Sequence, residues 1–563
     1  MSRPMDFVLA LHSHLPYVLN HGRWPHGSDW ICEATIDTYL PLLGQLERLA
    51  HDRVAVPLTI GITPILANQL ASPVYRDEQE AYFAQRLKTC AEAAESLSGT
   101  GDAHLLPLAR YWELHLLELQ RQFRRYDGNL AEAFRKHEEA GRIELISCAA
   151  THGFLPLLSR DESIRLQLSL GRAEHRRLFG KDPAGLWLPE CAYRPRGPWE
   201  PMPGAPRIED RAGIEEFVAA AGYKFFFVDS HLAAAGHAFR LYGAEGGPTA
   251  TGEVINSPYR AYRVAGSRGP TPVNAFVRDP VASRQVWSRR EGYPGDEWYL
   301  EFHKIRWPGG LKYWRVSAPG SDLGAKEEYE PARALARAAE HARHFVSLLE
   351  RIGSHQPGTE AGGSPASKVI AVPFDTELFG HWWHEGVDFL GAVYRELGRQ
   401  RSVRPVTGSQ HLGEAPADRA VHLTTGSWGA NGDFSMWLNP GTEWTWPRLW
   451  AIESTFWEVA RPALANPSQH LILAQAAREM LLAMSSDWQF IISTGAVTDY
   501  AVKRFTEHCT EAEFLISALQ LDATHQSAAH TRAAELWEQD HVFPDILSAV
   551  RAALATPAPA VVG

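Results

Sequence analysis

The stretch GLWLPECAYRPR, residues 185–196, decides how the rest of the chain is interpreted. Its apolar run at 186–188 is typical of a fully buried strand, and Pro189 ends that strand because proline has no backbone N–H to donate. Glu190 follows at once, among aromatic residues that can partly desolvate its carboxyl group and so prepare it for catalysis. The structural alternative is a loop carboxylate paired with Arg194 or Arg196.

A second stretch repeats the pattern. KVIAVPFDTELFGHWWHEG, residues 368–386, has a β-branched apolar run, then a proline, then Asp375. Parallel sheets and barrels carry their active sites at the carboxyl ends of their strands. If both strands belong to one such sheet, Glu190 and Asp375 therefore lie at the same end of it.

Composition narrows the class of protein. The chain has 563 residues, 45% hydrophobic and 21% charged, which is ordinary for a soluble enzyme of more than one domain. A net charge of −11 does not favour a nucleic-acid partner. Five scattered cysteines without a CxxC pair indicate neither a disulfide framework nor a structural zinc site. With no secretory leader and no membrane-spanning run, we expect a cytoplasmic protein without a membrane partner.

The chain alternates between apolar strand patterns and helical patterns. The expected strands are residues 6–11, 54–60, 142–147, 186–188, 224–228, 273–277 and 369–372. Helices are expected at residues 33–51, 161–179, 208–221, 331–352 and 387–399. This βα repeat predicts an α/β protein built on a parallel sheet or barrel.

Three segments interrupt or follow this repeat. Residues 75–141 have helical spacing and are too long for an ordinary connection, so we expect a helical insertion within a catalytic domain of residues 1–400. Residues 231–260, which include Tyr242, are expected to form a mobile loop over the site, and residues 353–367 a disordered loop. A C-terminal helical domain, residues 401–556, opens with a Trp-rich stretch and is followed by a disordered tail at 557–563.

Polar side chains follow most of the expected strands, and in a parallel barrel they meet at one end. They are His12, His14, His152, Glu190, Asp229, Arg278 and Asp375. Two carboxylates between aromatic walls are the layout of glycoside hydrolysis or glycosyl transfer, in which one attacks and the other donates a proton. Spacing alone leaves open which of the two attacks.

A metal site is the rival interpretation. His12 and His14 point the same way on an extended chain, and with His152 and Asp229 or Asp375 they could bind a divalent ion. That chemistry belongs to metal-dependent carbohydrate deacetylases and mannosidases. No HxxEH motif is present, so we favour hydrogen bonds from these histidines to sugar hydroxyl groups.

Nineteen tryptophans are an unusually large number, and tryptophan offers flat platforms for sugar rings. Candidate platforms in Gly-rich or polar loops are Trp24, Trp287, Trp428 and Trp437. Trp446, Trp450, Trp457 and Trp488 lie in helical patterns and are expected in the core. Asp487 lies in an apolar helix, as a cap, a buried polar partner or a contact to substrate.

Five segments together resemble glycoside hydrolase family 57, and within it the 1,4-α-glucan branching enzymes. They are HSHLPY at 12–17, ATHGFLP at 150–156, WLPECAYRP at 187–195, FDTELFGHWW at 374–383 and SSDWQF at 485–490. The resemblance implies a (β/α)7 barrel with a helical insertion and a C-terminal all-helical domain. It implies Glu190 as the retaining nucleophile, Asp375 as the general acid/base, and Tyr242 on a loop that shields the glycosyl-enzyme.

The resemblance also implies the remaining contacts. Trp287, Trp428 and Trp437 would bind glucan, while His12, His14, His152, Arg278 and Asp487 would contact the sugar subsites. No metal or organic cofactor is implied. We expect a monomer or small homo-oligomer that cuts α-1,4 links in amylose or glycogen and forms α-1,6 branches. Alternatives are an α-glucan hydrolase or 4-α-glucanotransferase with the same two carboxylates and, more remotely, a non-catalytic glucan-binding protein.

Overall fold

The fold is centred on seven parallel strands. A computed structural model describes residues 4–23, 26–98, 101–234, 256–267, 269–288, 291–307, 310–318, 320–354 and 368–555. The seven strands lie in the spatial order β10-β1-β2-β3-β4-β7-β9, with every neighbouring pair parallel. Their bounds are β1 Met5–Ser13, β2 Leu58–Ile62, β3 Ile143–Cys148, β4 Gly185–Trp187, β7 Phe225–Val228, β9 Gly269–Val277 and β10 Val369–Asp375.

The sheet curls until its two outer strands meet. Arg278, just after β9, forms a parallel bridge with Ala371 of β10, and the Asp279 backbone N–H donates to the Ala371 carbonyl oxygen at 2.7 Å. This narrow seam turns the seven strands into a distorted barrel. The (β/α)7 fold expected from the sequence is therefore confirmed.

Further strands extend the sheet beyond the ring. β8, Ala261–Gly266, pairs antiparallel with β9, and β12, Ala420–Val421, pairs with β8. β11, Val403–Pro405, pairs with β1 at its amino end. Residues 403–421 thus continue the sheet of the first domain, and the boundary expected at residue 400 falls before them.

Helices pack around the barrel between its strands. They are α1 Ser28–Ala34, α2 Leu40–His51, α3 Pro64–Leu70, α6 Leu130–Glu139, α7 Asp161–Phe179, α8 Ile214–Ala220, α9 Pro280–Trp287, α10 Pro331–Ser354, α11 Gly386–Leu397 and α12 Gly408–Glu414. A π-helical turn, Thr35–Tyr39, joins α1 to α2. Helix α10 begins at Pro331, where a missing N–H costs nothing because the first helical turn has no partner for it.

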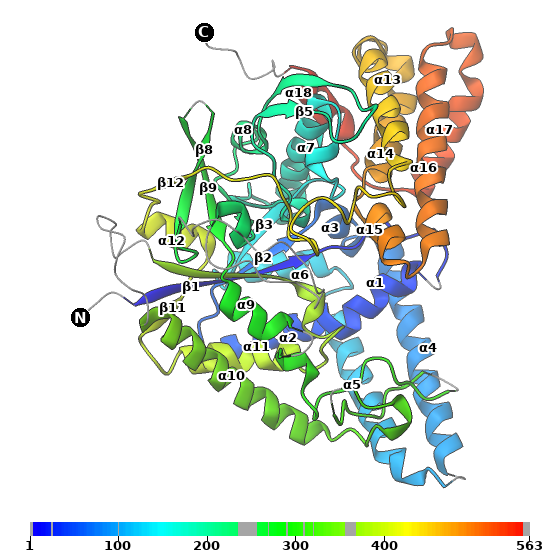
Figure 1. Ribbon diagram of the computed structural model, residues 1–563. Coiled ribbons are helices and arrows are strands. Elements are labelled where there is room, and N and C mark those ends of the chain that lie inside the picture. Colours follow the sequence, from blue (N-terminus) through cyan, green and yellow to red (C-terminus); the bar gives the residue numbers. More distant parts are fainter. Residues whose placement is uncertain are drawn as a thin grey trace.

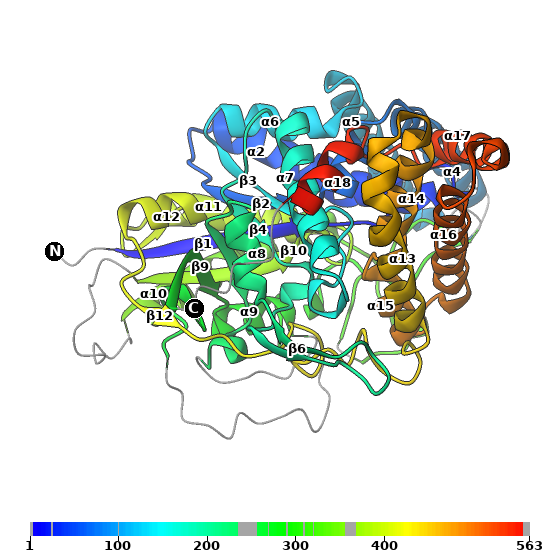
Figure 2. The same ribbon diagram turned by 90° about the horizontal axis from the view of Figure 1, so that it is seen from above.

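The expected insertion and C-terminal domain both appear as helices. Helices α4, Pro73–Ser98, and α5, Leu106–Arg125, form a pair that projects from the barrel, whereas α6 packs against β3 and α7 (Figure 1). The C-terminal helices are α13 Thr445–Ala465, α14 His470–Ala483, α15 Asp487–Thr494, α16 Thr498–Leu519, α17 Ser527–Gln539 and α18 Ile546–Ala555. In both views β1 runs from the N-terminus toward the C-terminal helices (Figure 1, Figure 2), so the carboxyl ends of the strands face that domain.

The short strand β4 needs the absence of a side chain at Gly185. A Cβ atom there would come within 2.5 Å of the Phe225 ring and 2.6 Å of Ile146 Cγ2. Both neighbours belong to strands of the barrel, so they have little room to move. Gly185 therefore permits the close packing that brings β4, and Glu190 after it, to the barrel mouth.

Two local expectations are wrong. The second strand begins at Leu58, not at residue 54, because Pro57 cannot donate to a ladder. Residues 208–211 form β6, Ile208–Arg211, which pairs antiparallel with β5, Gly197–Trp199, and the helix starts only at Ile214. Most of the expected loop at 231–260, including Tyr242, lies outside the described residues, as do residues 355–367 and the tail at 557–563.

Candidate active site

Glu190 sits in a strained turn directly after β4. Pro189–Cys191 form a single 3-10 turn in which Glu190 has φ +58° and Cys191 has φ +47°. Left-handed backbone at residues other than glycine costs about 1–3 kcal/mol each, and such strain is found at functional sites. The turn gives the carboxyl group one fixed direction at the barrel mouth.

The Glu190 carboxylate is held from two distant parts of the chain. Trp428 Nε1–H donates to Oε2 at 3.0 Å, and the Ser486 hydroxyl donates to Oε1 at 3.1 Å. His152 Nδ1 lies 3.7 Å from Oε1. Burial raises the pKa of Glu190 to about 7; the Trp428 hydrogen bond opposes this rise and the charge of Asp375 adds to it. A perturbed carboxyl group with a fixed direction is what catalysis requires.

The structural alternative for Glu190 fails on its expected partners. Arg194 Nη1 donates to the Ala212 carbonyl oxygen at 2.7 Å, and Arg196 pairs with Asp210 and Glu216. Both arginines thus stabilise the β5–β6 region. Glu190 is left to the groups that line the barrel mouth.

Asp375 is the last residue of β10 and stands beside His12 of β1 in the parallel register. Burial raises the pKa of Asp375 to about 7; the neighbouring Glu377 carboxylate adds to the rise and Arg278 opposes it. Within the described part of the chain no hydrogen bond is made to the Asp375 carboxyl group. Asp375 therefore lacks the donors that would stabilise its ionised form.

Three histidines stack beneath these carboxylates. The rings of His14 and His152 lie 4.0 Å apart, those of His152 and His12 5.0 Å apart, and His12 lies flat on Trp187 at 4.5 Å. Burial lowers the pKa of His12 and of His152 well below the usual value, so both are neutral at pH 7. The chain thus presents polar but uncharged rings at the barrel mouth.

Hydrogen bonds fix the tautomers of this stack. Ser486 gives its one proton to Glu190, so His152 Nδ1, 2.8 Å from Ser486 Oγ, must donate to that oxygen. His152 Nε2 then accepts from His12 Nε2, which lies 3.0 Å away. The chain His12–His152–Ser486 therefore ends at the carboxylate of Glu190.

The C-terminal domain contributes Asp487 to the site, next to His14. Asp487 Oδ2 lies 2.8 Å from His14 Nε2, and His14 Nδ1 lies 3.1 Å from Thr63 Oγ1. Burial would raise the pKa of Asp487, but the His14 charge and hydrogen bond hold it at about 2. Nothing in the sequence singles out Ser486, although it lies in the SSDWQF segment; its neighbour Asp487 is the signal that the segment offers.

A second group of interacting side chains lies at the barrel mouth. Arg278 Nη1 lies 3.2 Å from Asp229 Oδ2, and the Arg278 guanidinium lies 5.6 Å from the centre of the Trp428 ring. Burial opposes ionisation of Asp229, but His231 and Arg278 hold its pKa well below the usual range. The structure thus brings Glu190, Asp375, Asp229, Arg278 and Trp428 into one network.

The tryptophan candidates separate by burial. Trp428 contacts Glu190, and the half-buried Trp287 stacks on Phe374, the residue before Asp375, at 6.4 Å. Trp437 is a correction: it is 1% exposed and packs on Phe154 at 4.7 Å, so neither face of its ring is open to a sugar. Trp24 and Tyr242 lie outside the described residues. The expected core residues Trp446, Trp450, Trp457 and Trp488 are all buried, as predicted.

Three groups in the described residues bring possible metal ligands within 4.8 Å of one another. They are His12–Cys148–His152, His14–His152–Asp487 and Glu479–His508–Asp540. In the second group, which is nearest to Glu190, the ring nitrogens of His14 already face Thr63 and Asp487. These contacts form a complete hydrogen-bonded set, and Asp229 and Asp375 belong to none of the three groups.

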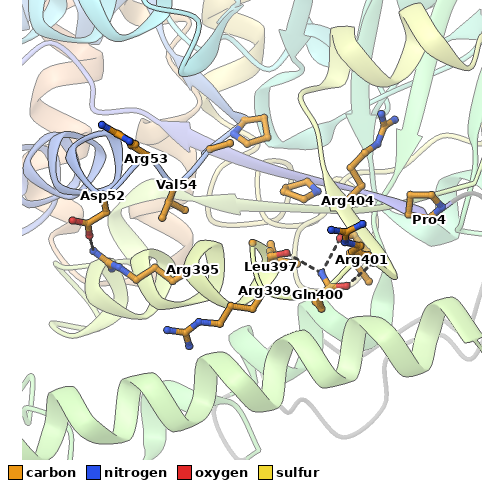
Figure 3. Close-up of a pocket in the computed structure, with 15 residues that line it drawn as sticks. Pro4, Asp52, Arg53, Val54, Arg395, Leu397, Arg399, Gln400, Arg401 and Arg404 are labelled. Atoms are coloured by element: carbon orange, nitrogen blue, oxygen red, sulfur yellow. Dashed lines mark hydrogen bonds and ion pairs between the residues drawn. The ribbon is translucent and has the colours of Figure 1, made fainter.

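A hollow of about 730 Å³ lies at the opposite, amino end of the barrel (Figure 3). Its lining includes Arg53, Arg395 and Arg404, whose guanidinium groups point in different directions in Figure 3. Arg395 pairs with Asp52, and Arg404 with Asp6 and Glu414. This end carries stabilising ion pairs, away from Glu190 and Asp375.

Two sequence models of known proteins together match most of the chain. Residues 8–423 match the sequence model of glycosyl hydrolase family 57, and residues 450–550 match that of the C-terminal part of 1,4-alpha-glucan branching enzymes. The chain is 40% identical over 515 residues to the 1,4-alpha-glucan branching enzyme TK1436 of Thermococcus kodakarensis, covering 91% of this chain and 73% of that protein.

Solved structures of similar proteins superpose on nearly the whole chain. The crystal structure of TK1436 superposes with a TM-score of 0.86 at 37% identity, over 97% of this chain and 96% of that one. A family 57-type branching enzyme from Pyrococcus horikoshii gives 0.86 at 36% identity, over 99% and 98%. The alpha-amylase AmyC from Thermotoga maritima gives 0.78 at 28% identity, over 97% and 99%.

Proposed function

The chain belongs to glycosyl hydrolase family 57, and we propose that it is a 1,4-α-glucan branching enzyme with Glu190 as nucleophile and Asp375 as general acid/base. It cuts an α-1,4 link in a glucan chain and joins the released chain to a 6-hydroxyl group, forming an α-1,6 branch. Its substrates are amylose and glycogen-like polymers. No cofactor is required by this mechanism.

One contrast carries the assignment of the two carboxylates. Glu190 accepts hydrogen bonds from Trp428 and Ser486, which stabilise its ionised form. Asp375 accepts none within the described residues and is repelled by Glu377, which favours its protonated form. Both pKa values lie near 7 and the charge of Asp375 raises the pKa of Glu190, so we assign one proton to the pair at neutral pH and place it on Asp375.

The two steps follow from this distribution. The Glu190 carboxylate forms a bond to the anomeric carbon while the bond from that carbon to the leaving O4 breaks, and Asp375 gives its proton to O4. In the second step the 6-hydroxyl of an acceptor attacks the anomeric carbon, its proton passes to Asp375, and Glu190 leaves. The configuration at the anomeric carbon is retained after two displacements.

The surrounding residues bind and orient the sugar. The histidines His12, His14 and His152, together with Asp487, can exchange hydrogen bonds with hydroxyl groups of the glucose unit at the cleavage point. Asp229, Arg278, Trp287 and Trp428 contact the neighbouring units, and Trp24 and Tyr242 are retained as proposed contacts from the sequence. Tyr242 would shield the glycosyl-enzyme from water, which favours transfer over hydrolysis.

Hydrolysis is the second candidate, because AmyC resembles the chain over nearly its whole length. The match of residues 450–550 to the C-terminal part of branching enzymes favours transfer. Ser486 and Asp487, from that same segment, reach Glu190 and His14. The segment that matches the branching-enzyme model therefore contributes side chains to the proposed site.

The test is incubation of the purified protein with amylose, beside Glu190→Gln. We expect loss of iodine colour, new α-1,6 anomeric protons by NMR and few new reducing ends, all absent in the variant. Many reducing ends without α-1,6 signals would establish a hydrolase instead. Binding without any turnover in the unmodified protein would overturn the enzymatic assignment.

We also propose a cytoplasmic protein that acts as a monomer or small homo-oligomer. All five cysteines are buried and free, which suits a reducing compartment. Within the described residues no helix combines the length and apolar character of a bilayer span. We propose a different role for each part of the chain. The barrel domain carries out catalysis, the inserted helix pair holds substrate, and the C-terminal helical domain completes the site.

A further inference from the structure

A second pocket, of about 560 Å³, lies where the inserted helices meet the barrel. Its walls come from α1 and the π-helical turn, from α4 and α5, from residues 300–312 and from residues 380–384. These segments follow β1, β2, β9 and β10, so the pocket opens at the carboxyl end of the barrel, like the site of Glu190 and Asp375. Its volume is in the range of ligand-binding cavities.

Two exposed indole rings lie at this pocket, one in its lining and one against a lining residue. Trp307 is 74% exposed and follows Arg306, whose backbone N–H donates to the Leu311 carbonyl oxygen at 2.9 Å. Trp382 is 57% exposed and packs at 4.7 Å on Phe302, which lines the pocket. Exposed apolar surface that gathers beside a groove marks ligand-binding sites. Flat exposed indoles suit the C–H faces of sugar rings.

The polar lining offers hydrogen-bonding groups with little net positive charge. His381 Nδ1 lies 3.0 Å from Asp37 Oδ2. Burial lowers the pKa of His384 to about 3 and lowers that of His115, so both rings are neutral and can donate and accept. The charged lining residues are Asp29, Glu33, Asp37, Arg86 and Lys312. Acidic groups outnumber basic ones, which disfavours a phosphorylated ligand and suits an uncharged, hydroxyl-rich one.

From these walls and this lining, we propose that the pocket is a second binding site for an α-1,4-glucan chain, with Trp307 as stacking platform and Asp37, Lys312 and His384 as hydrogen-bonding groups. The proposal rests on the proposed function, since it names where the same polymer is held. The segment from Asp375 to His384 runs from the catalytic carboxylate into the pocket wall. The proposed pocket and the site of Asp375 thus share one segment of the chain.

The test begins with binding. In the full chain carrying Glu190→Gln, which turns nothing over, isothermal titration with maltoheptaose is expected to resolve two classes of site. Adding Trp307→Ala, or Asp37→Asn, should weaken one class about fivefold or more, the loss of roughly one stacking or hydrogen-bonding contact. Leu114→Ala is the matched control: Leu114 is 66% exposed on α5, the helix that supplies Trp112 and His115, but does not line the pocket.

Kinetics supply the second readout. In the active protein, Trp307→Ala and Asp37→Asn should raise KM for long amylose about fivefold with kcat little changed, and Leu114→Ala should change neither. Identical titrations and identical KM values for Trp307→Ala, Asp37→Asn and the unmodified protein would overturn the proposal. Failure of the proposed function would look different, because branching would be absent in the unmodified protein while the titrations still reported on the pocket.

Discussion

Trp428 holds Glu190 by its side chain and its backbone at once. The indole Nε1–H donates to Glu190 Oε2 at 3.0 Å, and the backbone N–H of Trp428 donates to the Glu190 carbonyl oxygen, also at 3.0 Å. A residue after the barrel therefore fixes both the position of the strained turn and the direction of its carboxylate. This double contact couples the Trp-rich stretch to the proposed nucleophile.

Replacing Trp428 by Phe should move the acidic limb of the pH profile. The lost hydrogen bond is one of the effects that lower the pKa of Glu190, so that pKa rises and the nucleophile is protonated at higher pH. We expect the acidic limb of kcat to move upward by roughly one pH unit, or about 1.4 kcal/mol. The control is Trp437→Phe, a buried ring whose indole nitrogen has no hydrogen bond within the described residues. An unmoved limb in Trp428→Phe would contradict the role of this contact.

Glu377→Gln should act on the opposite limb. The charge of Glu377 raises the pKa of Asp375, so its removal lowers that pKa and Asp375 loses its proton at lower pH. Since the reaction needs Asp375 protonated, the alkaline limb should move downward by roughly half a pH unit or more. Glu385→Gln provides the comparison, because that buried carboxyl group bonds instead to Tyr329 and the Leu300 backbone. A shift of the acidic limb alone would reverse the assignment of the two carboxylates.

Ser486→Ala should reduce turnover without unfolding the protein. It removes the hydroxyl that donates to Glu190 Oε1 and leaves His152 Nδ1–H without its acceptor. We expect kcat to fall about tenfold, close to 1.4 kcal/mol of lost orientation and charge stabilisation. Ser486→Thr keeps the hydroxyl and should recover most of the rate. Equal losses in both variants would mean that packing, and not the hydrogen bond, is what matters.

A chelator should leave branching unchanged. His14 and Asp487 already satisfy each other at 2.8 Å, and neither Glu190 nor Asp375 belongs to a group of possible ligands in the described residues. Activity on amylose is to be measured after dialysis against EDTA and again after addition of Zn²⁺. If EDTA abolished activity and Zn²⁺ restored it, His14, His152 and Asp487 would instead be interpreted as metal ligands.

Gly185→Ala should destabilise the barrel. The new methyl group would meet the Phe225 ring and Ile146 Cγ2 at distances that packed atoms do not adopt, and overpacking of this kind costs about 1–3 kcal/mol. Gly197→Ala is the matched control, since a Cβ there meets nothing within 4 Å. Thermal unfolding of the two variants measures the difference. Equal midpoints would show that β4 has room to move.

Local pattern was enough to locate the elements of the barrel. Each of the seven strands was recognised as an apolar run, and α7 and α10 begin at the expected residues, Asp161 and Pro331. Glu190 and Asp375 could be identified as a pair because each comes shortly after an apolar run and a proline. These features can be recognised in the sequence because they depend on local backbone chemistry. They are missing N–H donors, alternating burial and helix starts.

What the sequence could not determine was which side chains meet. Trp437 and Trp428 occupy similar Gly-rich surroundings in the chain, yet one is buried against Phe154 and the other bonds to Glu190. Ser486 lies in the SSDWQF segment, but nothing in that segment indicates its place between His152 and Glu190, which exists only because the C-terminal helices close on the barrel mouth. The sequence determines which residue types follow each strand. Their pKa values and hydrogen bonds depend on burial and contacts that only the folded chain creates.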